Sequence, residues 1–136
     1  MNRLYMLDTN IVSDLVRNPR GLVLRHIVRV GSEAVCVSAI TAAELRYGCA
    51  RKGSAKLLAN VEAILGSIQV LAFDVPADAE YGGIRAELEV AGKPIGPNDL
   101  LIAAHAYSLG AVLVTANTGE FSRIRGLHVE NWLSPT

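Results

Sequence analysis

Three carboxylates that lie far apart in the sequence occupy similar positions, each near the end of an expected strand or in the helix that follows one. Asp8 directly follows the short apolar run 4–7, and Glu44 lies in a helix expected after the apolar run 34–37. Asp99 lies in the first turn of a later helix. Because the carboxyl ends of the strands meet at one edge of an open α/β sheet, we expect these side chains to converge there.

Such a cluster of carboxylates would bind a hard divalent cation. Converging carboxylates repel one another, and burial increases the energetic cost. Mg²⁺ prefers oxygen ligands, keeps several waters and also binds phosphates. It lowers the pKa of a bound water and stabilises charge on a phosphoryl oxygen. Asn117 adds an amide oxygen after a fourth strand, and no Gly-rich phosphate loop or serine–histidine pairing competes. The residues alone therefore indicate metal-assisted phosphodiester hydrolysis.

Each acid also has a purely structural explanation. Asp8 begins an Asp-Thr-Asn triplet, and these residue types form turns by bonding their own backbone. Thr41 and Glu44 have the spacing of a capping box, in which Glu44 would bond a backbone N–H at the start of its helix. Asp99 would be stabilised by the dipole of its helix, by ~0.3–1 kcal/mol. The local sequence favours the capping box at least as strongly as a catalytic role for Glu44.

Helical and strand patterns alternate along the chain. They predict helices at 11–17, 22–30, 41–52, 55–65, 76–91 and 98–109, and strands at 4–7, 34–37, 68–73, 111–115 and, at an edge, 128–130. We expect Asn98 to cap the sixth helix and the residues after Asn117 to form a charged loop. The alternation predicts one domain over residues 1–136, a three-layer α/β/α sandwich with a mostly parallel central sheet.

Composition excludes several classes of protein. The chain has 136 residues, of which 51% are hydrophobic and 19% charged, so it is long and apolar enough to bury a core. The net charge is zero, which argues against a strongly basic nucleic-acid binder. The charge is uneven, however, with five arginines in residues 1–30 and seven carboxylates in residues 61–100.

The remaining reactive residue types indicate no further site. Cys36 and Cys49 are too far apart for a CxxC pair, which argues against zinc or redox chemistry and favours a cytoplasmic location. The three histidines have no ligand spacing, and we expect His105 to pack against apolar neighbours. No segment has the ~20 consecutive apolar residues of a membrane span, and no signal peptide is expected.

Four segments in this order resemble the PIN-domain ribonucleases and, more closely, the VapC toxins of bacterial toxin–antitoxin pairs. They are MLDTNIVS at 6–13, SAITAAELRYG at 38–48, GPNDLLIAAHA at 96–106 and LVTANTGEFSRIRGLHVENW at 113–132. The resemblance implies that Asp8, Glu44 and Asp99 are catalytic and that Asp8 and Asp99 bind the metal ion. The fourth position, often aspartate in the wider family, falls on Asn117, a weaker ligand that either binds the ion or orients a water. Thr9, Ser38 and Thr115 lie beside these acids and are candidate hydrogen-bond donors to them.

The resemblance also implies an activity and partners. The expected protein is a Mg²⁺- or Mn²⁺-dependent endoribonuclease toxin that inhibits translation. A water activated by the ion would attack phosphorus in line and leave 5′-phosphate and 3′-hydroxyl ends. In similar toxins the target is the anticodon loop of initiator tRNA or ribosomal RNA. The implied partners are a second copy of the chain, a cognate antitoxin that covers the acidic site, and operator DNA bound only through that antitoxin.

Two other functions stay open at this point. A non-catalytic Mg²⁺-binding or interaction module, such as a receiver domain, would also need a lysine at a late strand end, and none lies near 115–119. A structure-specific DNA nuclease of the 5′-nuclease group would be larger, with a helical arch.

If an antitoxin binds, we expect its helix to lie over Leu15, Leu22 and Ile27, which one small domain would leave partly uncovered.

Overall fold

The centre of the fold is a five-stranded sheet in the order β3-β2-β1-β4-β5, in which all neighbouring strands are parallel. The structure, a computed structural model, describes residues 3–134. The strands are β1 (Tyr5–Leu7), β2 (Val35–Ser38), β3 (Gln69–Leu71), β4 (Val112–Val114) and β5 (Val129–Glu130). The strand order reverses at β1, because β2 and β4 lie on opposite sides of it. Ligands of open α/β sheets bind at such a switch point, and Asp8 directly follows β1.

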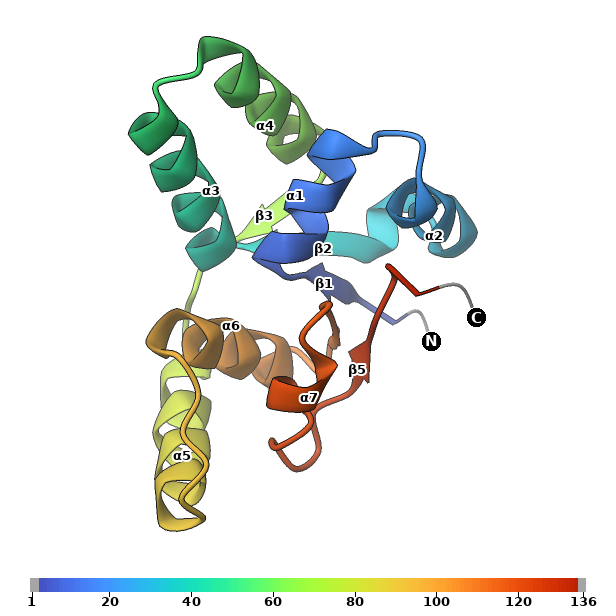
Figure 1. Cartoon of the computed structure of the whole chain (residues 1–136). Coiled ribbons are helices and arrows are strands. Elements are labelled where there is room, and N and C mark those ends of the chain that lie inside the picture. Colours follow the sequence, from blue (N-terminus) through green and yellow to red (C-terminus); the bar gives the residue numbers. More distant parts are fainter. Residues whose placement is uncertain (1–2, 135–136) are drawn as a thin grey trace.

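Helices cover both faces of the sheet, as Figure 1 shows. They are α1 (Thr9–Arg17), α2 (Leu22–Val30), α3 (Ala39–Lys52), α4 (Ala55–Ser67), α5 (Ala77–Val90), α6 (Pro97–Ser108) and α7 (Thr118–Phe121), with a 3₁₀ turn at Ser32–Ala34. In the view of Figure 1, α1, α2 and α4 lie above the sheet, and α5, α6 and α7 lie below it. The predicted three-layer α/β/α sandwich is therefore confirmed.

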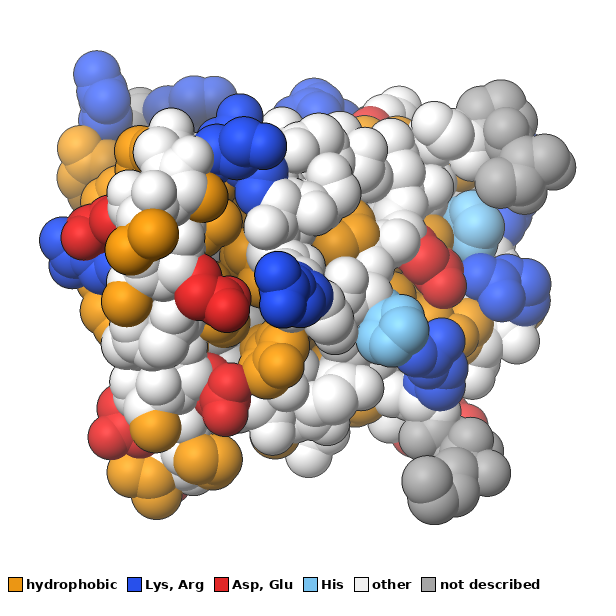
Figure 2. Space-filling model, turned by 90° about the horizontal axis from the view of Figure 1, so that it is seen from below, with side chains coloured by type: hydrophobic (Ala, Val, Ile, Leu, Met, Phe, Trp, Pro, Cys, Tyr) orange, Lys and Arg blue, Asp and Glu red, His pale blue; other side chains and the backbone are white. Residues whose placement is uncertain are grey.

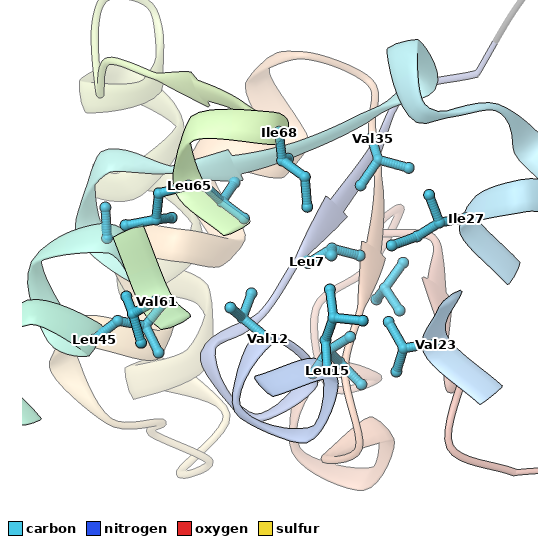
Figure 3. Packing of buried hydrophobic residues seen from close by; sticks show 14 of the residues in the cluster. Leu7, Val12, Leu15, Val23, Ile27, Val35, Leu45, Val61, Leu65 and Ile68 are labelled. Carbon is cyan, nitrogen blue, oxygen red and sulfur yellow. The ribbon is translucent and has the colours of Figure 1, made fainter. Parts of the chain in front are cut away.

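The sheet separates two hydrophobic clusters. Side chains alternate between the two faces of a strand, so Leu7 of β1 packs with the helices above the sheet and Met6 packs with those below it. The upper cluster contains Val12, Val61 and other apolar residues (Figure 3). Cys36 lies in the lower cluster, where burial raises the pKa of its thiol to about 12. A thiol with this pKa is unreactive at neutral pH, as expected for a structural cysteine.

The expected uncovered surface over the N-terminal helices is wrong for two of its three residues. Leu15 and Ile27 are only 7% exposed, and Figure 3 shows both pointing into the upper cluster. Leu22 is half-buried. A cavity of about 220 Å³ lies instead between α1, α3 and α4, with Val16 and Leu57 among the residues that line it.

Charged side chains are distributed over the surface. On the face shown in Figure 2, Lys and Arg side chains occur in several separate places, with acidic and hydrophobic ones between them. This pattern agrees with the zero net charge of the chain. Within residues 3–134, no helix combines the length and the apolar character needed to cross a membrane.

Candidate functional site

Asp8 lies at the carboxyl end of β1 and is the N-cap of α1. Its Oδ1 accepts the Thr9 backbone N–H at 2.8 Å, and its Oδ2 accepts the Thr115 hydroxyl at 2.8 Å. A longer contact of 3.4 Å joins Oδ2 to the Asn10 amide nitrogen. Asp8 is 3% exposed, and burial raises the pKa of its carboxyl although the bonds from Thr115 and Thr9 act in the opposite direction. Asp8 is therefore a buried carboxylate held in one orientation by donors from the start of α1 and from the residue that follows β4.

Glu44 projects from α3, and its surroundings exclude the capping box. The N-cap of α3 is Ser38, whose Oγ accepts the Ile40 N–H at 3.1 Å, so Thr41 lies inside the helix. The Thr41 hydroxyl is buried without a hydrogen-bond partner. The capping-box interpretation is therefore wrong, because the helix begins before the residue assigned as its cap.

The Glu44 carboxylate instead joins three helices. Its Oε1 accepts the hydroxyl of Thr9 on α1, and its Oε2 accepts the amide of Asn98 on α6 at 3.1 Å. The expectation that Asn98 caps α6 is wrong, since Gly96 is the N-cap and Pro97 the first helical residue. The side chain of Asn98 is therefore free to bind Glu44.

Asp99 lies in the first turn of α6, as expected, and is half-buried. Its carboxyl pKa is raised to about 7. Burial is the largest cause, followed by the charge of Asp8, a hydrogen bond and the charge of Glu120, and the charge of Glu44. Charge effects of this kind require short separations. The structure thus brings together the three acids singled out in the sequence and adds a fourth, Glu120.

Glu120 is the carboxylate that the sequence analysis missed. The segment after Asn117 forms the short helix α7 and not the expected loop. The Asn117 amide donates to Glu120 Oε2 at 3.0 Å, and its backbone N–H donates to the Thr115 hydroxyl at 3.0 Å. At the fourth position of the site, the Asn117 amide is thus accompanied by the Glu120 carboxylate, three residues later in the chain. The only signal in the sequence was that spacing of three, typical of one helical turn.

The other oxygen of Glu120, Oε1, is buried and has no hydrogen-bond partner. Two ionised carboxylates cannot bond each other, because both are acceptors. The hydrogen bond between Asp99 and Glu120 therefore forms only when Asp99 carries a proton, in agreement with its raised pKa. A cation placed between them would satisfy the same oxygens without the proton.

The described side chains supply no positive charge to this cluster. The three ion pairs among residues 3–134 all lie elsewhere and are Arg17–Asp14, Arg46–Glu62 and Arg85–Glu89. No three Asp, Glu, His or Cys side chains of the described residues come close enough to hold a metal ion between them. Mg²⁺, however, is usually held by one or two carboxylates and water. The donor set therefore fits an ion shared by Asp8, Asp99 and water.

The candidate hydrogen-bond donors differ in their positions. As predicted from the sequence, Thr9 and Thr115 donate to acids of the cluster, Thr9 to Glu44 and Thr115 to Asp8. Ser38 bonds none of the four acids, so the expectation that it donates to them is wrong. It caps α3, and its Oγ lies 2.8 Å from Nδ1 of His105 on α6.

Comparisons with known proteins agree with this arrangement. The PIN domain profile matches residues 5–127. The chain is 40% identical over 129 residues to the tRNA(fMet)-specific endonuclease VapC of Shigella flexneri, covering 94% of this chain and 97% of that protein. It is 42% identical over 131 residues to Ribonuclease VapC2 of Haemophilus influenzae, covering 95% and 98%.

Solved structures give the same result. VapBC2 from Rickettsia felis, bound to a DNA fragment from its promoter, contains a chain that superposes with a TM-score of 0.88 at 34% identity, covering 95% of this chain and 98% of that one. DNA-bound VapBC from Salmonella typhimurium gives 0.87 at 38% identity, covering 96% and 98%. With its parallel five-stranded sheet and its acids at the carboxyl edge, this chain belongs to the VapC branch of the PIN-domain family.

Proposed function

We propose that this chain is a divalent-metal-dependent endoribonuclease, the toxin of a toxin–antitoxin pair, which inhibits translation by cutting RNA. The observation that carries the proposal is an acidic cluster without a balancing cation. Asp8 is buried, the pKa of Asp99 is raised to about 7, and a buried oxygen of Glu120 has no partner. A divalent cation held by Asp8 and Asp99 would offset the repulsion among these carboxylates.

Asp8 and Asp99 would hold Mg²⁺ or Mn²⁺, with Glu120 next to them. When bound, such an ion stabilises charge on a phosphoryl oxygen and lowers the pKa of water. The rest of the work belongs to the chain. Thr115 and Thr9 fix the direction of the Asp8 oxygens, so the ligand geometry exists before substrate arrives.

Glu44 is suited to orient the attacking water. Each of its oxygens accepts one hydrogen bond, from Thr9 or from Asn98, and a carboxylate oxygen can accept two. One acceptor position per oxygen therefore remains for water. Asp99, with a pKa near neutrality in the metal-free site, can hold or release a proton at its carboxyl oxygens in the physiological range.

The relatives support the substrate and partners. The names of the similar proteins in S. flexneri and H. influenzae describe a tRNA(fMet)-specific endonuclease and a ribonuclease, and we propose RNA, with initiator tRNA as the first candidate, as the substrate here. The similar solved structures are VapBC complexes, two of them DNA-bound. A cognate antitoxin that carries operator DNA is proposed on the same basis, and a dimer of this chain on its resemblance to the VapC toxins alone.

The cavity between α1, α3 and α4 is the proposed antitoxin site. Apolar side chains of Val16, Leu57 and Val61 line one part of it, while Thr9 and Glu44 lie at the other. The apolar part suits the hydrophobic face of a helix. A basic side chain from the same segment would then meet the acidic cluster and block it.

Incubation of the purified chain with total RNA and with flap DNA, each in Mg²⁺ and in EDTA, tests the activity. We expect cleavage of RNA in Mg²⁺ alone, and a loss of at least roughly 100-fold in Asp99→Asn, because removing one transition-state contact typically has that effect. Cleavage of flap DNA in place of RNA would indicate the DNA nuclease. Mg²⁺ binding without cleavage of either substrate would indicate the non-catalytic module.

A further inference from the structure

A second cavity lies beside two of the segments that carry the acids, those of α6 and α7. It has a volume of about 560 Å³ and lies between the loop that precedes α6 and the residues of and after α7. Its lining consists of Gly92, Lys93, Pro94, Gly119, Ser122 and Arg123. Gly119 directly precedes Glu120 in the sequence, and Pro94 lies five residues before Asp99. The cavity therefore lies between the two chain segments that lead to Asp99 and Glu120.

The two charged side chains of this cavity are both cations. Arg123 Nη1 donates to the Pro94 carbonyl at 3.2 Å, which ties the segment after α7 to the loop before α6. A guanidinium has five N–H donors, so four remain for a ligand while the group is held in place. Neither Arg123 nor Lys93 takes part in an ion pair within residues 3–134. The cavity thus presents an anchored, unpaired guanidinium and an unpaired ammonium group.

A cluster of carboxylates repels RNA, which carries one negative charge per phosphate. A nuclease that brings RNA to such a cluster needs positive charge beside it, because phosphate contacts provide most of the affinity. We infer that Lys93 and Arg123 form a binding site for an RNA backbone phosphate next to the position of cleavage. This inference rests on the proposed ribonuclease activity of the acidic cluster.

The lining favours a phosphate over a protein segment. Pro94 is the only apolar side chain in it, whereas protein partners are usually anchored by large apolar or aromatic residues. The cavity between α1, α3 and α4 has such residues and this one does not. Gly119 leaves room, since a Cβ built there meets no atom within 4 Å. The space next to the two cations is therefore open to a phosphodiester group.

The test is the salt dependence of RNA binding in EDTA, where a metal-dependent nuclease does not cut. The probe is a fluorescent single-stranded RNA, whose log Kd changes with log salt by about 0.7 per phosphate contact. The double variant Lys93→Gln/Arg123→Gln should lower this slope by about 0.7, the value for one lost phosphate contact, and weaken binding several-fold at low salt. The matched control is Arg20→Gln/Lys56→Gln, which removes the same charge from exposed positions on other segments. Equal slopes in the two double variants would overturn the inference.

A second pair of variants avoids removing either cation. Gly119→Glu places a carboxylate in the cavity and Gly119→Gln an amide of the same size, and Gly119 has room for both. We expect Gly119→Glu to weaken RNA binding at least threefold more than Gly119→Gln, with melting temperatures that agree. Equal RNA binding by these two variants would also contradict the phosphate site.

Two other occupants give different results. A cavity for free phosphate would let inorganic phosphate raise the melting temperature of the wild type, but not of the Lys93→Gln/Arg123→Gln variant, with unchanged RNA slopes. A site for an acidic antitoxin segment would weaken antitoxin binding in that variant, again with unchanged slopes. Either result would overturn the RNA assignment. A lowered slope without any RNA cleavage by the wild type would retain the phosphate site and refute only the proposed nuclease.

Discussion

The proton that Asp99 holds in the metal-free protein makes stability depend on pH. Its folded pKa is about 7, against an ordinary value of 3.8. Between these two values the folded protein binds a proton that the unfolded chain has already lost. Asp99 therefore contributes stability below pH 3.8, loses it as pH rises to about 7, and contributes no further change above that.

The first prediction follows from this sign. In EDTA, Asp99→Asn should flatten the decline of unfolding free energy between about pH 4 and pH 7, and at pH 8 it should be more stable than the wild type by about 1 kcal/mol, allowing for partial solvent screening. Urea unfolding at several pH values measures this. Glu87→Gln, an exposed acid on α5, should leave the decline as it is. A decline that persists unchanged in Asp99→Asn would show that its carboxyl is not perturbed.

The second prediction concerns the ion. Mg²⁺ that binds only the folded site should stabilise the wild type by ~1.4 kcal/mol at tenfold excess over Kd. Asp8→Asn and Asp99→Asn should each lose most of this gain, because each removes one of the two carboxylates that approach each other. Thermal melts with and without Mg²⁺, at fixed ionic strength, give the answer. An equal gain in all three proteins would place the ion elsewhere.

The third prediction separates chemistry from stability at Glu44. In Glu44→Gln the amide oxygen can still accept from Asn98, and the Thr9 hydroxyl can rotate to accept from the amide nitrogen. Stability should therefore change by less than about 0.5 kcal/mol, as for most conservative exposed or half-buried changes. RNA cleavage should fall roughly 100-fold or more, because the negative charge that orients water is lost. Cleavage at the wild-type rate would leave Glu44 with a structural role only.

Part of the site was predictable from the sequence because two of its acids mark the boundaries of regular elements. Asp8 follows a strand and Asp99 lies in the first turn of a helix, so the edge of the sheet places both. Glu120 was not predictable, because α7 has four residues, too few for helical periodicity to be read. The capping role expected for Thr41 was wrong because both Ser38 and Thr41 are residue types that cap helices. Only the structure shows that Ser38 accepts a free N–H at the start of α3.

At the scale of elements, the sequence predicted order and type better than boundaries. The helix expected to end at residue 65 continues through Gly66 to Ser67, since one glycine costs a helix only about 1 kcal/mol. The strand expected at 68–73 is reduced to Gln69–Leu71. Phe73 lies after this strand and is apolar because its side chain packs against the core. Its ring lies edge-on to that of His105, with centroids 5.5 Å apart. Apolar character therefore marks burial in the core as well as pairing in the sheet.

His105 also joins the two helices that carry Glu44 and Asp99. Its Nδ1 lies 2.8 Å from the Ser38 hydroxyl at the cap of α3. Burial lowers the pKa of its imidazole, although a backbone hydrogen bond with Ala72 acts in the opposite direction. The Ala72 carbonyl would accept a ring N–H, and since Nδ1 faces Ser38, we expect the proton on Nε2. The Ser38 hydroxyl then donates to Nδ1 while it accepts the N–H at the start of α3.

The fourth prediction tests this junction. His105→Leu should destabilise the protein by about 1–3 kcal/mol, because the buried Ser38 hydroxyl loses its acceptor. The loss should be smaller in His105→Asn, whose amide oxygen can accept at the same place. The imidazole pKa of His105 is lower in the folded protein than its ordinary value of 6.5, so the free energy of unfolding decreases as pH falls below 6.5. His105→Leu should remove this decrease. Denaturant unfolding at pH 8 and pH 5.5 measures both effects, and equal losses in the two variants would contradict the hydrogen-bond assignment.

At the scale of the whole molecule, the two layers of helices provide different surfaces to partners. Below the sheet, α6 and α7 carry Asp99 and Glu120, and the segments next to these helices carry Lys93 and Arg123, a combination that suits RNA. Above it, α1, α3 and α4 leave a partly apolar cavity that reaches Glu44. An antitoxin segment lying in that cavity would therefore reach the acids from the side of α1 and α3. It would not occupy the cavity lined by Lys93 and Arg123.

The fifth prediction compares two neighbouring leucines of α4. Leu57 lines the cavity between α1, α3 and α4, whereas Leu58 is 42% exposed and is not part of that lining. Burying one leucine contributes about 1.5–3 kcal/mol, so Leu57→Gln should weaken antitoxin binding by roughly 10–100-fold. Leu58→Gln, the same change one residue away, should leave the Kd within about twofold. Titration of each variant with the purified cognate antitoxin gives both constants, and melts of the free proteins separate lost contact from lost folding. If Leu58→Gln weakens binding more than Leu57→Gln does, the antitoxin lies on the outer face of α4 and the acidic cluster must be covered in another way.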